Sequence, residues 1–474
     1  MRKLPATRTP SEDTAATTTA APAPAPTAPT PTAPTPTAPA REHYRNPWLA
    51  RALLATWSGD RFVQIASPPG AGKTTLITEL AEQLLHRAGL LTAVAAQTRA
   101  QALDVANRLG KVMAATGTSA SDGADSDPLT GTPEVALLGK DKHRPSGLAA
   151  DVAFISDAGL RNYRGVVVAT TARWQVTNPA AWPCDVLLVD EAWQATAASL
   201  LALGSLAPQV VCVGDPGQIR PVVTGSVHRW RTWAAGPHQP APDAFAARYG
   251  AEHVTKQRLP YTWRLGPETT ALIQPAFYPD LPFTSARPER YLTAPGEGTH
   301  EHGQHDQHGA RLPELSARTV ATSAGPSDPA LPAAAAARVR ELLHCAVVDA
   351  QHPGGRPLTA HDVAVITPHV DQQCAVAAHL ADLPGVLCAT TNAAQGLERE
   401  AVVVIHPLAG YREAPEFAVD PGRLCVALSR HRSHATVLCD PHTSTVLNAA
   451  QHADPDNTDL LTQQHVLAHL LARR

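Results

Sequence analysis

Short runs of apolar residues alternate with stretches of helical spacing along most of the chain. The runs are four to six residues long and mostly rich in Val, and they lie at 62–66, 91–96, 165–169, 186–189, 210–213, 363–367, 401–405 and 435–439. The stretch 74–87, which follows the first run, places its apolar residues at helical spacing. Continuous Val, Ile and Leu runs separated by helices are typical of parallel strands that are buried on both faces. Two sets of such runs predict an α/β fold with two lobes in tandem and a cleft between them.

Composition limits the compartment and the partners. The chain of 474 residues has 44% hydrophobic and 17% charged residues and a formal net charge of −3. This balance excludes a binder that holds nucleic acid through a strongly basic tail, so any nucleic acid must lie in a local groove. No run approaches the roughly 18 apolar residues of a membrane span, and residues 1–10 lack the apolar segment of a signal peptide. The seven cysteines include no CxxC pair and lie mostly in apolar strings, which predicts buried, reduced thiols in a cytoplasmic protein without a membrane partner.

Irregular regions mark the predicted domain organisation. A run of only Thr, Ala and Pro fills most of residues 1–40, so we expect a disordered tail there, either merely solvated or used to dock a protein partner. We expect the first lobe over residues 41–236, with a small insertion at about 110–165, and the second lobe over residues 237–474. A flexible loop is expected at about 296–330. Its histidines favour an exposed loop over a metal site, and they are His300, His302, His305 and His308.

A glycine-rich loop between the first apolar run and the helix after it is the strongest local pattern. It reads Ser67-Pro-Pro-Gly-Ala-Gly-Lys-Thr-Thr75, with Ser where the consensus has a first Gly. Such a loop turns backbone N–H groups onto a β-phosphate, its Lys reaches the β and γ oxygens, and its hydroxyl holds Mg²⁺. We predict that a nucleoside triphosphate binds Gly70, Ala71, Gly72, Lys73, Thr74 and Thr75, with Thr74 at the Mg²⁺.

Two acidic residues follow another predicted strand of the same lobe. The sequence Leu187-Leu-Val-Asp190-Glu191 ends an apolar run in a pair of carboxylates. A nucleoside triphosphatase needs one carboxylate near its metal and one that orients and deprotonates the attacking water. We predict the first role for Asp190 and the second for Glu191.

Motifs of one enzyme family then follow in order along the chain. Asp190-Glu-Ala-Trp-Gln194 resembles the DEAxQ box of superfamily 1B helicases, the group of the nonsense-mediated-decay and Okazaki-fragment-processing helicases. Further segments resemble the family's other motifs, and they are PPGAGKTT (68–75), AQTRAQALD (96–104), VATTA (168–172), VGDPGQIRP (213–221), LPYTWRL (259–265), TTNAAQGLE (390–398) and RLCVALSRHR (423–432). The resemblance spans about residues 60–440. It implies two RecA-like P-loop NTPase lobes with parallel sheets and an ATP cleft between them.

The resemblance implies roles for residues of both lobes. Arg264 and Arg430, from the second lobe, would reach the γ-phosphate only when the lobes close, and Gln218 would relay between the water and the nucleic-acid groove. Without the motif around it, each arginine is more typical of a surface or ion-pair residue. Gln395 would join the γ-phosphate set, and Gly396 next to it would bind the nucleotide.

The ribose, the base and the strand are assigned from the same resemblance. Glu398 would take the ribose hydroxyls, while no adenine-reading glutamine is found upstream, which leaves Tyr44, Arg45 or Trp48 to stack on the base. Strand phosphates would contact Thr98, Thr171 and Thr390, for which a helix cap or turn is the alternative. For Trp193 and Trp263, inside motifs, we expect a place in the core or at a lobe interface rather than base stacking.

The function expected from these features is an ATP- and Mg²⁺-dependent helicase or translocase on single-stranded nucleic acid. The resemblance implies 5′-to-3′ movement, with DNA as the expected strand and RNA left open. The alternative is a nucleotide-gated ATPase switch, controlled by nucleic acid or a protein partner, that does not unwind processively. A P-loop kinase or metabolic enzyme would not need Gln218, Arg264, Gln395 and Arg430 in this order.

Overall fold

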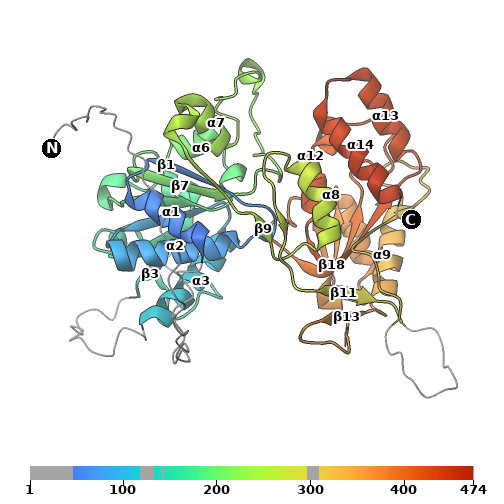
Figure 1. Ribbon diagram of the computed structural model, residues 1–474, viewed down its shortest axis with the longest axis horizontal. Helices are drawn as coiled ribbons and strands as arrows, with labels where there is room; N and C mark the ends of the chain where they lie inside the picture. The colour runs from blue at the N-terminus through green and yellow to red at the C-terminus, as the bar shows by residue number, and fades with distance from the viewer. Residues whose placement is uncertain (1–45, 118–132, 141–142, 296–308, 473–474) are drawn as a thin grey trace, which may run out of the picture. The chain divides into compact units, whose positions relative to one another are not determined.

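The computed structural model describes residues 46–117, 133–140, 143–295 and 309–472 (Figure 1). The tail predicted over residues 1–40, together with Tyr44, Arg45 and the four histidines of the predicted loop, lies outside the described residues. Within them, two sheets are parallel throughout, one of eight strands and one of five. The predicted α/β class with two parallel sheets, as in two RecA-like lobes, is confirmed.

The first sheet has the strand order β4-β3-β5-β2-β6-β7-β1-β8. Its strands are β1 (Phe62–Ala66), β2 (Thr92–Ala96), β3 (Val135–Leu138), β4 (Ala153–Ile155), β5 (Val166–Thr170), β6 (Val186–Val189), β7 (Gln209–Gly214) and β8 (Thr255–Arg258). Every residue of β2 and β6 is buried, as expected of central strands covered on both faces. Five of the predicted apolar runs form the centre of this sheet.

The two edges of this sheet use segments that sequence reasoning placed elsewhere. β3 and β4 lie in the region expected to be a small insertion, and they extend the sheet beyond β5. β8 comes after residue 236, yet it pairs in parallel with β1. The chain therefore leaves the first sheet after Arg258.

Helices cover both faces of the first sheet. α1 (Pro47–Trp57), α2 (Lys73–Ala88) and α3 (Arg99–Gly117) share one core with alternate strand residues such as Ile65 and Val94. The shorter α4 (Asp157–Leu160), α5 (Thr171–Gln175), α6 (Ala197–Leu201) and α7 (Ala241–Tyr249) belong to the opposite side. There Trp174 and Trp182 are buried and stacked, with ring centroids 6.0 Å apart.

The second sheet has the order β12-β18-β17-β15-β16. Its strands are β12 (Leu315–Thr319), β15 (Val363–Thr367), β16 (Leu387–Thr390), β17 (Arg399–Ile405) and β18 (His431–Cys439). One core lies against α8 (Pro267–Phe277), α11 (Glu416–Val419), α12 (Pro421–Leu428), α13 (Thr443–Ala453) and α14 (Thr458–Leu471), and the other lies against α9 (Ala330–Leu342) and α10 (Val370–His379). Two small additions are β9 (Tyr261–Thr262) with β10 (Thr284–Ser285), and an antiparallel sheet of β11 (Arg290–Thr293), β13 (Ala346–Asp349) and β14 (Arg356–Pro357).

β12 differs from the loop expected at about 296–330. It is an edge strand of the second sheet and pairs in parallel with β18. Leu315 and Ala317 are buried and alternate with the more exposed Ser316, which is the pattern of a strand with one covered face. The segment was missed because it lacks the continuous Val and Ile runs of the central strands.

Two further expectations concern cysteines and membranes. Most of the seven cysteines are buried, but Cys374 is exposed on α10 and Cys388 is partly exposed, so the expectation of buried thiols is wrong for these two. No helix in the described part of the chain is long and apolar enough to cross a membrane.

Candidate nucleotide-binding site

A cavity of about 1170 Å³ collects most of the predicted site residues. Its walls come from the segments after β1, β2, β6 and β7 and from segments beside β16, β17 and β18. The predicted residues that line it are Gly70, Ala71, Gly72, Lys73, Thr74, Thr75, Thr98, Asp190, Glu191, Gln218, Arg264, Gln395, Gly396, Glu398 and Arg430. Thr171 and Thr390 do not line it. Residues from both sheets thus share one cavity.

The glycine-rich loop takes a left-handed turn at two glycines. Gly70 has a φ of 72° and Gly72 a φ of 86°, which side chains with a Cβ rarely adopt. A Cβ on Gly70 would also lie 2.3 Å from the Cβ of Arg264. The loop therefore needs glycine at position 70 for two reasons, its backbone angle and the close approach of Arg264.

Lys73, the first residue of α2, faces two carboxylates. Its Nζ lies 3.2 Å from Glu191 Oε1 and 4.0 Å from Asp215 Oδ2. Asp215 is fully buried, and burial raises its pKa even though Lys73 acts to lower it. The lysine therefore sits where it can neutralise charge at the carboxyl end of β6 and β7.

Glu191 is the only residue other than glycine with a positive φ in the described part of the chain. Its φ of 50° and ψ of 45° put it in the left-handed region, at the start of the short helix Ala192–Gln194. Residues held in this region are enriched at functional sites. Its neighbour Asp190 is buried and accepts a 2.8 Å hydrogen bond from the backbone N–H of Glu191. Burial, and then the charge of Glu191, raise the pKa of Asp190 to about 7.

Gln218 is linked to the second part of the chain through Asp215. Its Nε2 donates to Asp215 Oδ2 at 2.6 Å, and the hydroxyl of Tyr278 donates to Asp215 Oδ1 at 2.7 Å. Gln218 Oε1 is buried without a hydrogen-bond partner among the described residues. The sequence analysis assigns no role to Asp215, although it belongs to the quoted segment 213–221, or to Tyr278. Their pairing across 63 positions is invisible in the linear pattern.

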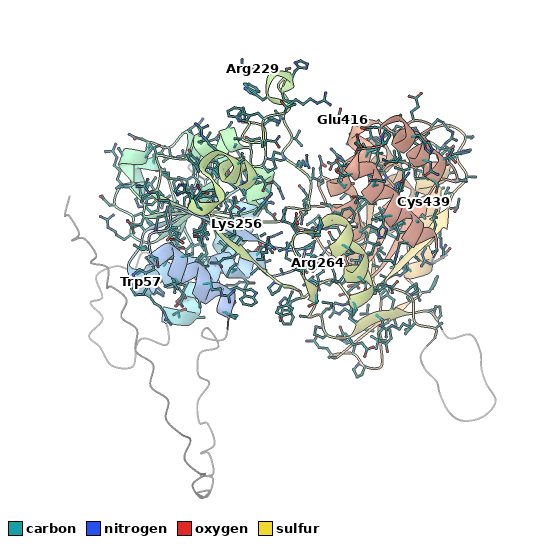
Figure 2. The ribbon with its side chains drawn as sticks, turned by 45° about the horizontal axis from the view of Figure 1, so that its top comes forward. Trp57, Arg229, Lys256, Arg264, Glu416 and Cys439 are labelled. Atoms are coloured by element: carbon teal, nitrogen blue, oxygen red, sulfur yellow. The ribbon has the colours of Figure 1, made fainter. Side chains whose placement is uncertain are left out.

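Arg264, labelled in Figure 2, comes from the segment after β9. A carboxylate holds its side chain. Its Nε donates to Glu398 Oε2 at 2.6 Å and its Nη1 donates to the Ser429 carbonyl oxygen at 3.2 Å. Glu398 also accepts a hydrogen bond from Arg432. Burial acts to raise the pKa of Glu398, but the charges of Arg264 and Arg432 outweigh it and lower the pKa to about 2. Glu398 is thus engaged by two arginines.

Arg430 differs from Arg264 because it is buried without a carboxylate. Its Nε donates to the Val426 carbonyl oxygen at 3.0 Å and its Nη2 to Ser429 Oγ at 2.7 Å. No carboxylate oxygen of a described residue lies within 4.0 Å of its guanidinium. Burial, with the charge of Arg264, lowers the pKa of Arg430 to about 10. A buried cation beside the cavity is suited to receive an anion.

The tryptophans split between the core and the cavity. Trp193 is buried and its Nε1 donates to Asp243 at 3.0 Å, which confirms the core position. Trp263 is 60% exposed and lines the cavity that both sheets share, so it takes the second of the two expected places, at the lobe interface. In the extended segment before Arg264, neighbouring side chains point to opposite sides, and the buried Thr262 leaves Trp263 facing outward. Trp48 packs against the first core and does not line the cavity.

Two further predicted residues of the second part, Gln395 and Gly396, line the cavity. Gln395 Nε2 is buried with no partner among the described residues. Gly396 has a φ of 77° and open space where a Cβ would stand. Both lie in the turn between β16 and β17. An incoming polar group therefore finds a free donor here.

The three predicted strand-binding threonines are placed differently. Thr98 is exposed and caps α3, since its Oγ1 accepts from the backbone N–H of Gln101 at 3.2 Å. Thr171 is buried and donates to the Ala96 carbonyl oxygen at 3.3 Å. Thr390 Oγ1 accepts from the backbone N–H of Ala393 at 3.3 Å. Each hydroxyl therefore has a local structural partner.

Comparison with family models identifies the class of these two parts. Residues 49–241 match a model described as an AAA domain, and residues 332–442 match a second model with the same description. The pair is typical of superfamily 1B helicases, so the resemblance found in the motifs is confirmed. Domains of this P-loop class bind nucleoside triphosphates, and their presence implies NTPase activity.

Comparison with solved structures finds viral helicases. The helicase of PRRSV aligns at 17% identity and a TM-score of 0.41, over 82% of this chain and 55% of that chain. The arterivirus nonstructural protein 10 helicase aligns at 15% identity and a TM-score of 0.40, and its complex with DNA at 16% and 0.39. The chain spans 55–63% of the length of these structures. No curated protein matches the chain.

Proposed function

We propose that this protein is an ATP-dependent helicase or translocase of superfamily 1 that acts on single-stranded nucleic acid. The observation that carries the proposal is the shared cavity, in which Lys73 and Glu191 face Arg264 and Arg430. Phosphoryl transfer depends mainly on positioning and on stabilising charge, and arginines supplied from a second surface contribute about 10³ to 10⁵ in rate. A site assembled from two parts of a chain can couple hydrolysis to their movement.

The catalytic roles follow from burial and hydrogen bonding. In the proposal the glycine-rich loop holds the phosphates, and Lys73 leaves Glu191 for the β and γ oxygens. Glu191 then orients the attacking water and takes its proton, with Gln218 beside it. Arg430 and Arg264 stabilise charge at the γ-phosphate, while Gln395 adds a donor.

Mg²⁺ fits the residues present. Asp190 is a buried carboxylate whose pKa is raised to about 7, so a nearby divalent cation would favour its charged form. Mg²⁺ is commonly held by one or two carboxylates together with substrate phosphates and water. Asp190 and the hydroxyl of Thr74 would hold it, and it would supply charge neutralisation at the phosphates. Among the described residues, no group of three or more His, Cys, Asp or Glu side chains forms a metal site by itself.

Base and strand are assigned more coarsely. Trp263 replaces Trp48 as the aromatic candidate for the base, since it is exposed, lines the cavity and neighbours Arg264. Thr98 is the predicted strand contact that remains exposed at this cavity. Movement in the 5′-to-3′ direction and a preference for DNA rest on the motif resemblance alone. Unwinding of only 3′-tailed duplexes would contradict that polarity.

The test is the steady-state ATPase rate of the wild type and Glu191→Gln, without nucleic acid and then with single-stranded DNA or RNA. We expect one polymer to stimulate the ATPase rate of the wild type strongly. In Glu191→Gln the stimulated rate should be lower by at least about 100-fold. Glu191→Gln keeps the side-chain shape and should still bind ATP, which a fluorescent nucleotide analogue would show. A basal rate that is indifferent to both polymers would reject the motor.

The alternative is an ATPase switch that binds nucleic acid or a partner without processive unwinding. It is favoured by the shape of the first part, where β3 and β4 extend the sheet and form no separate accessory domain among the described residues. A strand-displacement assay with tailed duplexes separates the two. Stimulated hydrolysis without displacement would support the switch.

A further inference from the structure

The segment between Gln218 and α7 has an unusual composition. Residues 216–242 contain three arginines, two histidines and two tryptophans, and no Asp or Glu. The whole chain, by contrast, has a formal net charge of −3. A stretch of this length without a carboxylate keeps a local positive potential that the global charge conceals.

Much of this segment is exposed. Trp233 is 48% and Val222 71% exposed, and regular structure is limited to a short 3₁₀ turn at His228–Trp230. The guanidinium of Arg229 lies over the ring of Trp230, 4.6 Å from its centroid. Figure 2 shows Arg229 on a part of the chain that projects away from the sheets. The segment therefore offers both cations and an aromatic face to solvent.

Two of the arginines have no acidic partner. No carboxylate of a described residue lies within 4.0 Å of Arg229 or Arg231. Arg220 differs, because its charge acts on Asp243 and Asp420 and opposes the rise that burial causes in the pKa of both. The positive potential of the segment is consequently concentrated at its outer part.

The segment is joined directly to the nucleotide cavity. It includes Gln218, whose backbone packs closely on α12, since a Cβ on Gly422 would lie 2.7 Å from the Gln218 carbonyl oxygen. Ile219 is buried next to it. A ligand that moves the segment would therefore act on Gln218, which contacts Asp215.

We propose that residues 220–233 form a contact surface for single-stranded nucleic acid, in which Arg229 and Arg231 bind phosphates and Trp233 stacks on a base. The proposal rests on the proposed function and adds a site that no motif of the sequence assigns. Arginines interleaved with exposed aromatic side chains are the combination that binds single strands without reading their sequence. Phosphate is the complement of an acid-free arginine surface, and a base is the complement of an exposed indole.

The test measures binding of labelled oligothymidylate and oligouridylate by fluorescence anisotropy over a range of salt concentrations. We compare the wild type with Arg229→Ala/Arg231→Ala and with Trp233→Ala. The matched control is Arg161→Ala/Trp57→Ala, which removes an exposed arginine and a 74% exposed tryptophan far along the chain from this segment. Thermal unfolding shows that each variant is folded.

The two variants should fail in different ways. Loss of two phosphate contacts should weaken binding and reduce the slope of log K against log salt by about 1.4. Trp233→Ala should weaken binding roughly fivefold or more with the slope unchanged. Both should reduce the stimulation of ATP hydrolysis by the strand, and the control should match the wild type.

Two results would overturn the proposal. If the wild type is stimulated by the strand and both variants bind as tightly as it does, the segment is not the contact surface, although the motor survives. If the wild type neither binds a strand nor responds to one, the proposed function fails first. If the segment instead binds a protein or a membrane, both variants would bind the strand as tightly as the wild type does.

Discussion

The cavity has two walls of opposite electrostatic character. The wall from the first sheet carries Asp190 and Glu191 beside Lys73, whose Nζ also lies 4.0 Å from the buried Asp215, and burial raises the pKa of both aspartates. On the wall from the second part, arginines outnumber the acids that pair with them, and burial lowers the pKa of Arg430. Each wall therefore holds charge that its own residues do not neutralise.

The comparison explains what the cavity is built to accept. A triphosphate with a divalent cation would give the acidic wall a cation and the basic wall an anion at once. Binding of this ligand would thus neutralise the uncompensated charge of both walls at once. Neither half of the chain supplies both of the charges needed for this. The difference between the walls, more than any single residue, argues for a metal-nucleotide as the ligand.

The largest effect is expected from Arg430→Ala, which removes the buried arginine of the basic wall. We expect its ATPase kcat to fall about 10³-fold, because the arginine would stabilise transition-state charge. Its thermal stability should not fall, since the variant removes a buried cation that has no carboxylate partner. Arg264→Ala is the matched variant, and it should lower the melting temperature because it breaks the pair with Glu398. Equal loss of stability in both variants would contradict the contrast.

Acid should destabilise the second part of the chain more than the first. His406 and His434 are buried in the second part, and burial lowers the pKa of each to about 4. Because the unfolded chain binds protons first as the pH falls below about 6.5, stability should decline from there to about pH 4. Each histidine accounts for on the order of 3 kcal/mol at pH 4.

Hydrogen exchange at pH 5 and pH 7 would measure this loss, with faster opening expected in the second sheet than in the first. His406→Asn keeps an acceptor for the Leu408 N–H, which now donates to His406 Nδ1 at 3.1 Å. It should reduce the acid sensitivity. Equal acid opening of both sheets would reject the assignment.

Trp263→Ala tests the exposed aromatic of the basic wall. Loss of stacking on the base should raise the KM for ATP about tenfold with kcat little changed, because stacking acts equally on ground and transition states. Trp263→Phe should recover most of the affinity. An unchanged KM would remove Trp263 from the nucleotide site.

Glu398→Gln gives the smallest expected effect. Its carboxylate is already engaged by Arg264 and Arg432, so we expect a few-fold fall in kcat through misplaced Arg264 and little change in KM. The wild type should use dATP nearly as well as ATP. Strong preference for ATP, lost in Glu398→Gln, would instead support the ribose role inferred from the motif.

Local patterns predicted the parts of the site that lie close together along the chain. The glycine-rich loop and Asp190 with Glu191 follow buried strands, and parallel strands carry such ends to one edge of a sheet. The apolar runs likewise predicted the central strands, because burial on both faces leaves a continuous hydrophobic signal.

Contacts between distant segments were not predictable in this way. The bond from Tyr278 to Asp215 and the capture of Glu398 by Arg264 depend on how two parts of the chain meet. Edge strands such as β8 and β12 lack a continuous apolar run, since one side of each is uncovered. The outward position of Trp263 was not predictable from local alternation either, because its buried neighbour is the polar Thr262.

The left-handed backbone at Glu191 has a consequence for how this chain would respond to selection. A glycine there would relieve local strain worth about 1 kcal/mol or more. A screen for heat resistance alone would therefore favour Glu191→Gly. The selected variants would be more stable to heat but unable to hydrolyse ATP. Catalysis and thermal stability therefore favour different residues at position 191. Efforts to stabilise the protein should leave this position unchanged.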